Sequence, residues 1–139
     1  MKNLFLDTNV IIDLIADRKP FSKYAIELFN AAENGHLQIY TSSHSVATTH
    51  YLLKKYIAED KLREILYNLL DYLIVIPVDV QVLKIGLKSA HKDFEDAIQI
   101  TCAIRQAEII GIVTRNKKDF RKSELPVLSP DEACALLEK

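Results

Sequence analysis

The chain is poor in the residues that mark several classes of protein. It has no tryptophan, one methionine, three glycines, four prolines and only two cysteines among 139 residues. Cys102 and Cys134 are too few for a disulfide framework, and neither belongs to a close Cys/His set of the kind that binds zinc. Internal repeats and low-complexity tracts are also missing, which excludes a repeat architecture. We therefore expect a reduced, cytoplasmic protein in which Cys102 is a small core residue.

The chain also lacks an excess of positive charge and a long hydrophobic run. Eighteen Lys and Arg against 19 Asp and Glu give a net charge of -1, so any binding of a polyanion depends on a local patch. No run approaches the roughly 20 apolar residues of a membrane-spanning helix. Asp7, Asn9 and Asp13 interrupt the N-terminal apolar stretch where a signal peptide stays apolar. We expect neither a membrane partner nor export by a signal peptide.

What the chain does contain is a globular mixture of residues. Hydrophobic residues make up 49% of it and charged residues 27%, which excludes general disorder. One domain of 139 residues buries about two-thirds of its unfolded surface. We expect residues 1–139 to form a single domain.

Apolar runs alternate with segments of helical periodicity along the chain. Strands are expected at residues 3–6, 37–41, 73–78, 109–114 and, briefly, 127–128. Helices are expected from Asp7 towards Pro20, from Pro20 to near Gly35, over 43–73 as a hairpin broken near 58–60, and over 80–90, 94–107 and 130–137. Residues 115–123 form a polar loop or short turn. This order predicts an α/β fold, a three-layer α/β/α sandwich with a mainly parallel sheet of four to five strands.

Polar side chains follow two of the expected strands. Asp7 comes directly after residues 3–6, and Asn116 and Asp119 come just after residues 109–114. Ligands of doubly wound sheets bind outside the carboxyl ends of the strands, so both groups stand at the edge where sites form. Taken alone, Asp7 is more typical of a helix cap and Asn116 of a turn.

A third acidic group begins the helix expected at 94–107. Asp93 and Asp96 are three positions apart, so their side chains share one helix face. In isolation, a capping residue followed by first-turn acids explains the pattern equally well. If the three acidic groups converge, their repulsion is costly unless a carboxyl is protonated or a divalent cation lies between them. Hard carboxylate oxygens suit Mg2+ or Mn2+.

The segment around Asn116 is positively charged. Its acids, Asp119 and Glu124, are outnumbered by Arg115, Lys117, Lys118, Arg121 and Lys122. Metals held by carboxylates beside a basic rim are what phosphodiester hydrolysis needs, because metals bind the scissile phosphate while Lys and Arg neutralise its neighbours. A solvated turn is the ordinary alternative for such a charge run.

Three motifs carry a family resemblance. They are LDTNVIID at residues 6–13, DFEDA at residues 93–97 and VTRNKKDF at residues 113–120. In their order and spacing they resemble the PIN-domain family, especially the VapC-like toxins of prokaryotic toxin–antitoxin pairs, over nearly the whole chain. The resemblance implies a parallel sheet between helices and an endoribonuclease whose clustered acids bind Mg2+ or Mn2+. It also implies an RNA substrate, a homodimer and a small antitoxin protein as a partner.

The resemblance and the chemistry of the residues together give roles to particular positions. By resemblance, Asp7, Asp96 and Asp119 are catalytic and bind the metal with Asn116, and Asp93 of the neighbouring motif is a further candidate ligand. Supporting roles go to Thr8, Asn9, Thr114 and Thr48. RNA contacts go to Arg115, Lys117 and Lys118. Asp13 lies nearly two helical turns after Asp7 and is expected at the surface.

One position departs from the family pattern and leaves two functions open. The family usually has a Glu early in the helix after the second strand, and Thr48 stands there in SSHSVATTH, residues 42–50. Asp93, Glu95, His44 or His50 is left to compensate, although a helical histidine is more often an ordinary hydrogen-bonded residue. The chain is then either a metal-dependent endoribonuclease or a non-catalytic PIN-like module that binds RNA or a protein. A phosphotransfer domain with Asp7 as nucleophile is disfavoured.

Overall fold

The computed structural model describes residues 1–138 and contains a five-stranded sheet in the order β3-β2-β1-β4-β5. The strands are β1 (Lys2–Leu6), β2 (Leu37–Ser42), β3 (Leu73–Ile76), β4 (Gly111–Val113) and β5 (Val127–Leu128). Every neighbouring pair is parallel. The order runs outward from β1 to β3 and then returns to the other side of β1, which is the arrangement of a doubly wound sheet.

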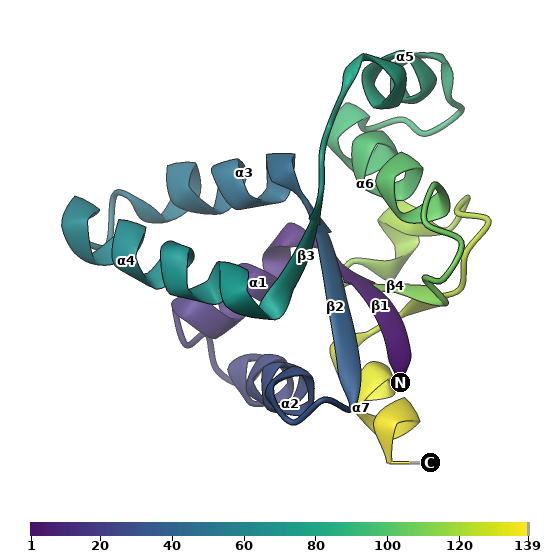
Figure 1. Cartoon of the computed structure of the whole chain (residues 1–139). Helices are drawn as coiled ribbons and strands as arrows, with labels where there is room; N and C mark the ends of the chain where they lie inside the picture. Colours follow the sequence, from purple (N-terminus) through teal and green to yellow (C-terminus); the bar gives the residue numbers. More distant parts are fainter. Residues whose placement is uncertain (139) are drawn as a thin grey trace.

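Helices cover both faces of this sheet (Figure 1). They are α1 (Thr8–Ile15), α2 (Ser22–Glu33), α3 (Ser43–Leu53), α4 (Glu59–Leu69), α5 (Val80–Lys88), α6 (Phe94–Ile104) and α7 (Pro130–Leu137), with 3₁₀ turns η1 (Leu70–Tyr72) and η2 (Lys117–Phe120). Alternate residues of a strand point to opposite faces. Leu4 and Leu6 accordingly pack with residues of α1, α2 and α7, whereas Phe5 packs with residues of α5 and α6. The predicted three-layer α/β/α fold is confirmed.

The hairpin of α3 and α4 projects from one side of the sandwich (Figure 1). A small buried cluster of Ile12, Leu53 and Leu62 joins the hairpin to α1. The predicted pair of helices in this region is therefore confirmed. The break between them comes slightly earlier than residues 58–60, since α3 ends at Leu53.

Several element ends differ from the predicted ones. α1 ends at Ile15, well before Pro20, and Asp17 then adopts a left-handed conformation with φ 49° that an α-helix does not continue. α6 ends at Ile104 rather than at residue 107. β4 is shorter than residues 109–114 because it pairs with β1 over Gly111–Val113. The polar segment after β4 contains the turn η2.

Gly86 interrupts the sequence of α5 without interrupting the helix. Glycine has a low helix propensity, yet α5 is continuous over Val80–Lys88. A Cβ atom at Gly86 would lie 3.5 Å from the ring of Phe94 and 3.7 Å from the Cβ of Ala97. These are ordinary van der Waals distances, so α5 packs against α6 at this point and has room for a Cβ atom.

The longest helix, α2, has 12 residues. Within residues 1–138, none of the helices combines the length and the apolar character needed to cross a membrane.

The fold brings the ends of β1 and β4 together at the middle of the sheet. Leu6 pairs with Val113, and the N–H of Asp7 donates to the carbonyl of Val113 at 2.9 Å. Chain segments more than a hundred residues apart thus leave the sheet side by side. This is also where the strand order reverses, the usual position of a ligand site in doubly wound folds.

Candidate active site

Asp7 is held in one orientation at the end of β1. It is the N-cap of α1: its Oδ1 accepts the N–H of Thr8 at 2.7 Å. Its Oδ2 accepts the hydroxyl of Thr114 at 2.8 Å. The side chain is only 8% exposed, and burial raises the pKa of Asp7 despite these two hydrogen bonds. Asp7 can therefore cap α1 and also take part in a binding site.

Thr114 connects the end of β4 to the start of α1. It is fully buried, and its hydroxyl oxygen accepts the backbone N–H of Asn116 at 3.1 Å and the amide of Asn9 at 3.4 Å. Asn9 Oδ1 in turn accepts the N–H of Arg115 at 3.4 Å. Thr8, Asn9 and Thr114 thus lie around Asp7 and fix its surroundings. Asn116 is exposed at the start of η2.

Asp96 faces this group from the first turn of α6. Asp93 is the N-cap of that helix, since its Oδ1 accepts the N–H of Asp96 at 3.0 Å. Burial and then the charges of four nearby carboxylates raise the pKa of Asp96 to about 7; these belong to Asp93, Asp7, Asp119 and Glu95. Like charges raise a carboxyl pKa only over short distances. Asp96 therefore lies near enough to Asp7, Asp93 and Asp119 for their charges to act on it, and it shares a pocket with Asp93 and Asp119.

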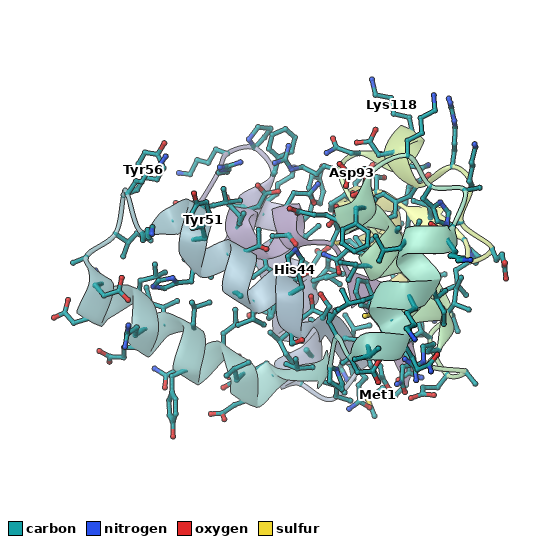
Figure 2. The ribbon with its side chains drawn as sticks, turned by 90° about the horizontal axis from the view of Figure 1, so that it is seen from above. Met1, His44, Tyr51, Tyr56, Asp93 and Lys118 are labelled. Carbon is teal, nitrogen blue, oxygen red and sulfur yellow. The ribbon has the colours of Figure 1, made fainter. Side chains whose placement is uncertain are left out.

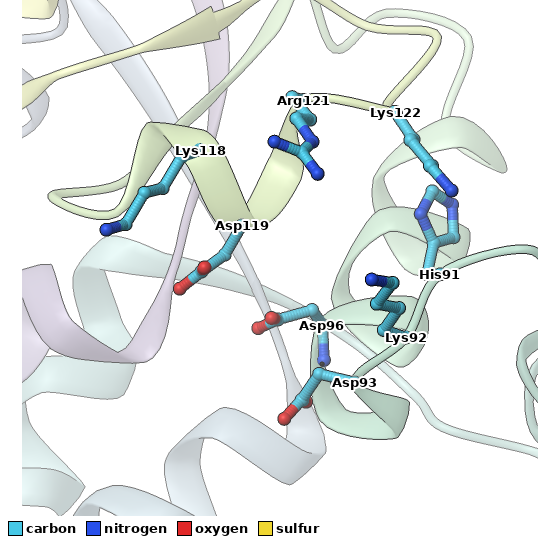
Figure 3. A pocket seen from close by; sticks show the side chains of 8 residues that line it. All are labelled: His91, Lys92, Asp93, Asp96, Lys118, Asp119, Arg121 and Lys122. Carbon is cyan, nitrogen blue, oxygen red and sulfur yellow. Dashed lines mark hydrogen bonds between the residues drawn. The ribbon is translucent and has the colours of Figure 1, made fainter.

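Asp119 completes the group from η2. With Asp93 and Asp96 it lines a pocket of about 140 Å³. Figure 3 shows these three acids at its centre with basic side chains around them, which are His91, Lys92, Lys118, Arg121 and Lys122. The pocket has room for a hydrated ion or a phosphate group.

The donor set fits a hard divalent cation in its chemistry. Carboxylates and an amide oxygen are the ligands that Mg2+ and Mn2+ prefer, and the acids meet where the charge of a cation removes their repulsion. Among residues 1–138, no three His, Cys, Asp or Glu side chains gather tightly enough to hold one ion. The negative charges that raise the pKa of Asp96 therefore belong to carboxylates that are not gathered around a single point.

The basic residues predicted to contact RNA have different surroundings. Arg115 donates to both carboxylate oxygens of Asp13, at 2.7 and 3.2 Å, and stacks 4.2 Å from the ring of Phe21. The prediction of Asp13 as a surface residue is wrong, because its side chain is 1% exposed. Lys117 pairs with Glu132 at 2.8 Å. Lys118 alone of the three predicted contacts lines the acidic pocket.

Thr48, which stands where the family usually has Glu, is hydrogen-bonded to a histidine of the same helix. Thr48 Oγ1 lies 3.3 Å from Nε2 of His44, one turn earlier in α3. The same Nε2 lies 3.7 Å from Glu95 of α6; Figure 2 shows His44 on α3 and the start of α6 at Asp93. His50 instead contacts Glu59 at 2.7 Å within the hairpin. Of the two histidines, His44 is therefore the one that faces the acidic group.

Gln99 is a site residue that the sequence analysis missed. It is 2% exposed, and its amide donates to Thr8 Oγ1 at 3.0 Å and to the hydroxyl of Ser45, while its oxygen accepts the hydroxyl of Ser42 at 3.0 Å. It thereby ties α6 to the starts of α1 and α3. The available signal was a polar residue three positions after Asp96, on the same helix face and between Ile98 and Ile100.

This geometry agrees with the comparisons with known proteins. The sequence model of the PIN domain matches residues 3–118, so the chain belongs to the PIN-domain family and the resemblance noted in the sequence is confirmed. Ribonuclease VapC1 of Aquifex aeolicus is 27% identical over 138 residues, which cover 96% of this chain and 94% of that protein.

Solved structures of toxin–antitoxin proteins have the same fold. A toxin–antitoxin complex from Klebsiella pneumoniae matches with a TM-score of 0.66 and 25% identity, covering 91% of this chain and 97% of that one. VapBC2 from Rickettsia felis, bound to a DNA fragment from its promoter, matches with a TM-score of 0.67 and 20% identity over 91% and 98% of the two chains. The protein is thus a distant relative of VapC-type ribonucleases.

Proposed function

We propose that this protein is a divalent-metal-dependent endoribonuclease in which Asp7, Asp96 and Asp119 hold Mg2+ or Mn2+ beside an RNA phosphate. The observation that carries the proposal is that carboxylates from β1, α6 and η2 lie near the same edge of the sheet: Asp96 and Asp119 line one pocket, and Asp7 and Asp119 both raise the pKa of Asp96. A structural role does not explain three mutually repelling acids without a cation. The 27% sequence identity with a ribonuclease supports RNA cleavage as the reaction.

The side chains divide the work according to their surroundings. Asp7 is the most firmly held of the three proposed metal ligands, because the hydroxyl of Thr114 and the N–H of Thr8 bind its two oxygens. Asp96 and Asp119 are more exposed to solvent, with Asn116 and Asp93 as further oxygen donors at the border. Mg2+ or Mn2+ supplies an activated water and neutralises charge on the scissile phosphate. Gln99 keeps the helices that carry these acids in register.

The relatives support a biological setting. We propose that the protein is the cytoplasmic toxin component of a toxin–antitoxin pair, that it forms a homodimer and that a small antitoxin binds it. The support is that a fold relative from Klebsiella pneumoniae is solved as a toxin–antitoxin complex. This support is an analogy between folds, and it does not identify the partner.

A non-catalytic PIN-like module that binds RNA or a protein is the second candidate function. The observation that favours it is the replacement of the family Glu by Thr48, whose hydroxyl is engaged with His44. One carboxylate fewer weakens the hold on a divalent cation. A binding module retains the surface around the pocket and needs no metal.

Cleavage of structured and single-stranded RNAs with Mn2+, Mg2+ or EDTA distinguishes the two functions. For an enzyme we expect metal-dependent cleavage that falls at least about a hundredfold in Asp7→Asn and Asp96→Asn, since even residues that only support metal ligands cost ten- to a hundredfold. Asp71→Asn makes the same chemical change in η1, outside the acidic group, and retains activity. Equal activity of Asp96→Asn and wild type contradicts the metal site. A folded wild type that binds RNA and takes up no Mn2+ in calorimetry supports the binding module.

A further inference from the structure

Glu95 is an acid in the first turn of α6 that is not among the metal ligands proposed above. Its side chain is 64% exposed, and Nε2 of His44 on α3 lies 3.7 Å from its carboxylate, within ion-pair distance. The hydroxyl of Thr48 lies 3.3 Å from the same nitrogen. The pair of Glu95 and His44 is therefore beside the residue that stands where the family usually has its second acid.

Hydrogen bonds place this pair close to the end of β1. Thr8 donates its hydroxyl to Ser45 at 2.9 Å, and the amide of Gln99 donates to both of these hydroxyls. One junction thus joins the first turns of α1 and α3 to α6. Each residue of the junction lies within about one helical turn of an acid or a histidine of its own segment, and these are Asp7, His44 and Glu95.

The charges agree with this placement. Burial raises the pKa of Asp7 and of Asp96, and the negative charge of Glu95 raises both further. Like charges act on a carboxyl pKa only over short distances. Glu95 therefore belongs to the electrostatic surroundings of acids from two different elements, β1 and α6.

The other candidates to replace the missing acid are engaged differently. One carboxylate oxygen of Asp93 accepts the N–H of Asp96 at 3.0 Å as the cap of α6. His50 contacts another acid within the hairpin, at 2.7 Å. The Nε2 atom of His44 already faces the carboxylate of Glu95, which suits a group that orients an acid rather than one that binds a cation itself.

We propose that Glu95 is a metal ligand of the acidic group and that His44 positions it, in place of the Glu that Thr48 replaces. This inference rests on the proposed nuclease function and adds a ligand to the same site. The acidic group gains a fourth charged oxygen donor, and the affinity of a carboxylate site for a divalent cation depends on the number of such donors. The exposed side chain of Glu95 leaves its carboxylate room to reach a bound cation, while His44 restricts its orientation.

Titration calorimetry of the full chain with Mn2+ tests this inference without measuring cleavage. We expect Glu95→Gln to bind Mn2+ at least about tenfold more weakly than wild type, because even residues that only support metal ligands cost ten- to a hundredfold in affinity. The matched control Glu64→Gln makes the same chemical change at an exposed position of α4 and keeps the wild-type affinity. In Glu95→Gln/Thr48→Glu, a carboxylate at the usual family position should restore tight binding. No recovery contradicts the view that Glu95 acts in place of that acid.

Two replacements of His44 test its positioning role. His44→Gln keeps an N–H group that can contact a carboxylate, whereas His44→Phe keeps only a ring. We expect His44→Phe to weaken Mn2+ binding about tenfold and His44→Gln to retain most of the affinity, with both variants melting in EDTA as wild type does. A lower melting temperature of His44→Phe with unchanged Mn2+ affinity shows a structural role and overturns the positioning role.

The outcomes separate this inference from the nuclease proposal. If wild type binds Mn2+ and cleaves RNA while Glu95→Gln binds Mn2+ as wild type does, the inference is overturned and the nuclease stands. If wild type binds no Mn2+, both fail. If both His44 variants lose Mn2+ binding while Glu95→Gln keeps it, His44 is itself the ligand and the assignment of Glu95 is overturned.

Discussion

Two buried aspartates of the α1 region, six positions apart, are in opposite electrostatic situations. Asp13 is 1% exposed and receives two hydrogen bonds from the guanidinium of Arg115. Asp7 is 8% exposed and receives only a hydroxyl and a backbone N–H, while Asp119 and Glu95 add negative charge. One acid has its counter-ion in the fold and the other has like charges as neighbours. The comparison distinguishes an acid that stabilises the fold from an acid that is placed for a ligand.

The largest expected difference between the two acids is in stability. Asp13→Asn leaves the charge of Arg115 half-buried without a partner, and we expect a loss of about 3 kcal/mol in the free energy of unfolding. Asp7→Asn removes an uncompensated charge and keeps an oxygen for the Thr8 N–H, so we expect a change below about 1 kcal/mol. Urea denaturation of both variants measures this. Equal losses contradict the assignment of Asp13 to the fold and Asp7 to the site.

The second expected difference is the response to a metal ion. A ligand that binds only the folded state at a hundred times its Kd stabilises that state by about 2.7 kcal/mol. We expect Mn2+ to raise the melting temperature of wild type and of Asp13→Asn, and EDTA to reverse the effect. In Asp7→Asn the increase should be absent. A similar increase in all three proteins places the ion outside the acidic group.

A smaller effect is expected at the hydrogen bond that orients Asp7. Thr114→Val keeps the shape of the side chain and removes the hydroxyl that donates to Asp7 Oδ2. We expect RNA cleavage to fall ten- to a hundredfold with a stability loss of about 1–2 kcal/mol. Thr101→Val is the matched control, because its hydroxyl donates to the Ala97 carbonyl of its own helix. Equal activities of the two variants rule out a positioning role for Thr114.

The smallest effect is expected at the exposed ion pair of Lys117 and Glu132. The ammonium of Lys117, followed by the N–H and hydroxyl of Ser129, lowers the pKa of Glu132 from 4.5 to about 2. The folded state therefore holds this proton more weakly than the unfolded state, and the stabilisation present above pH 4.5 is lost as the pH falls towards 2. Because water screens the pair, we expect Glu132→Gln to cost less than about 1 kcal/mol at pH 7.

Urea denaturation of wild type and Glu132→Gln at pH 7 and pH 3 measures this difference. The gap between the two proteins should be smaller at pH 3. A gap that is the same at both pH values shows that the charge of Glu132 does not stabilise α7.

The position of the acids was predictable because it depends on local rules. Asp7 follows an apolar strand, Asp96 begins a helix after a capping residue, and Asp119 follows the fourth strand. In parallel sheets these positions share one edge. The partner of Asp13 was not predictable, because Arg115 lies 102 positions away and the pair depends on how the segment after β4 leaves the sheet. Gln99 was missed for the same reason, since its hydrogen-bond partners belong to two other helices.

The sequence by itself determined the alternation of strands and helices, the parallel sheet and the edge at which its acids gather, because periodicity and strand ends are properties of short segments. Only the tertiary structure decided which charges are neutralised. Arg115 and Lys117 stand beside Lys118 in the sequence, yet the first two pair with Asp13 and Glu132 while Lys118 lines the acidic pocket. Electrostatic energy depends on the distance between charges and on their burial. Residues that are neighbours along the chain can differ in both.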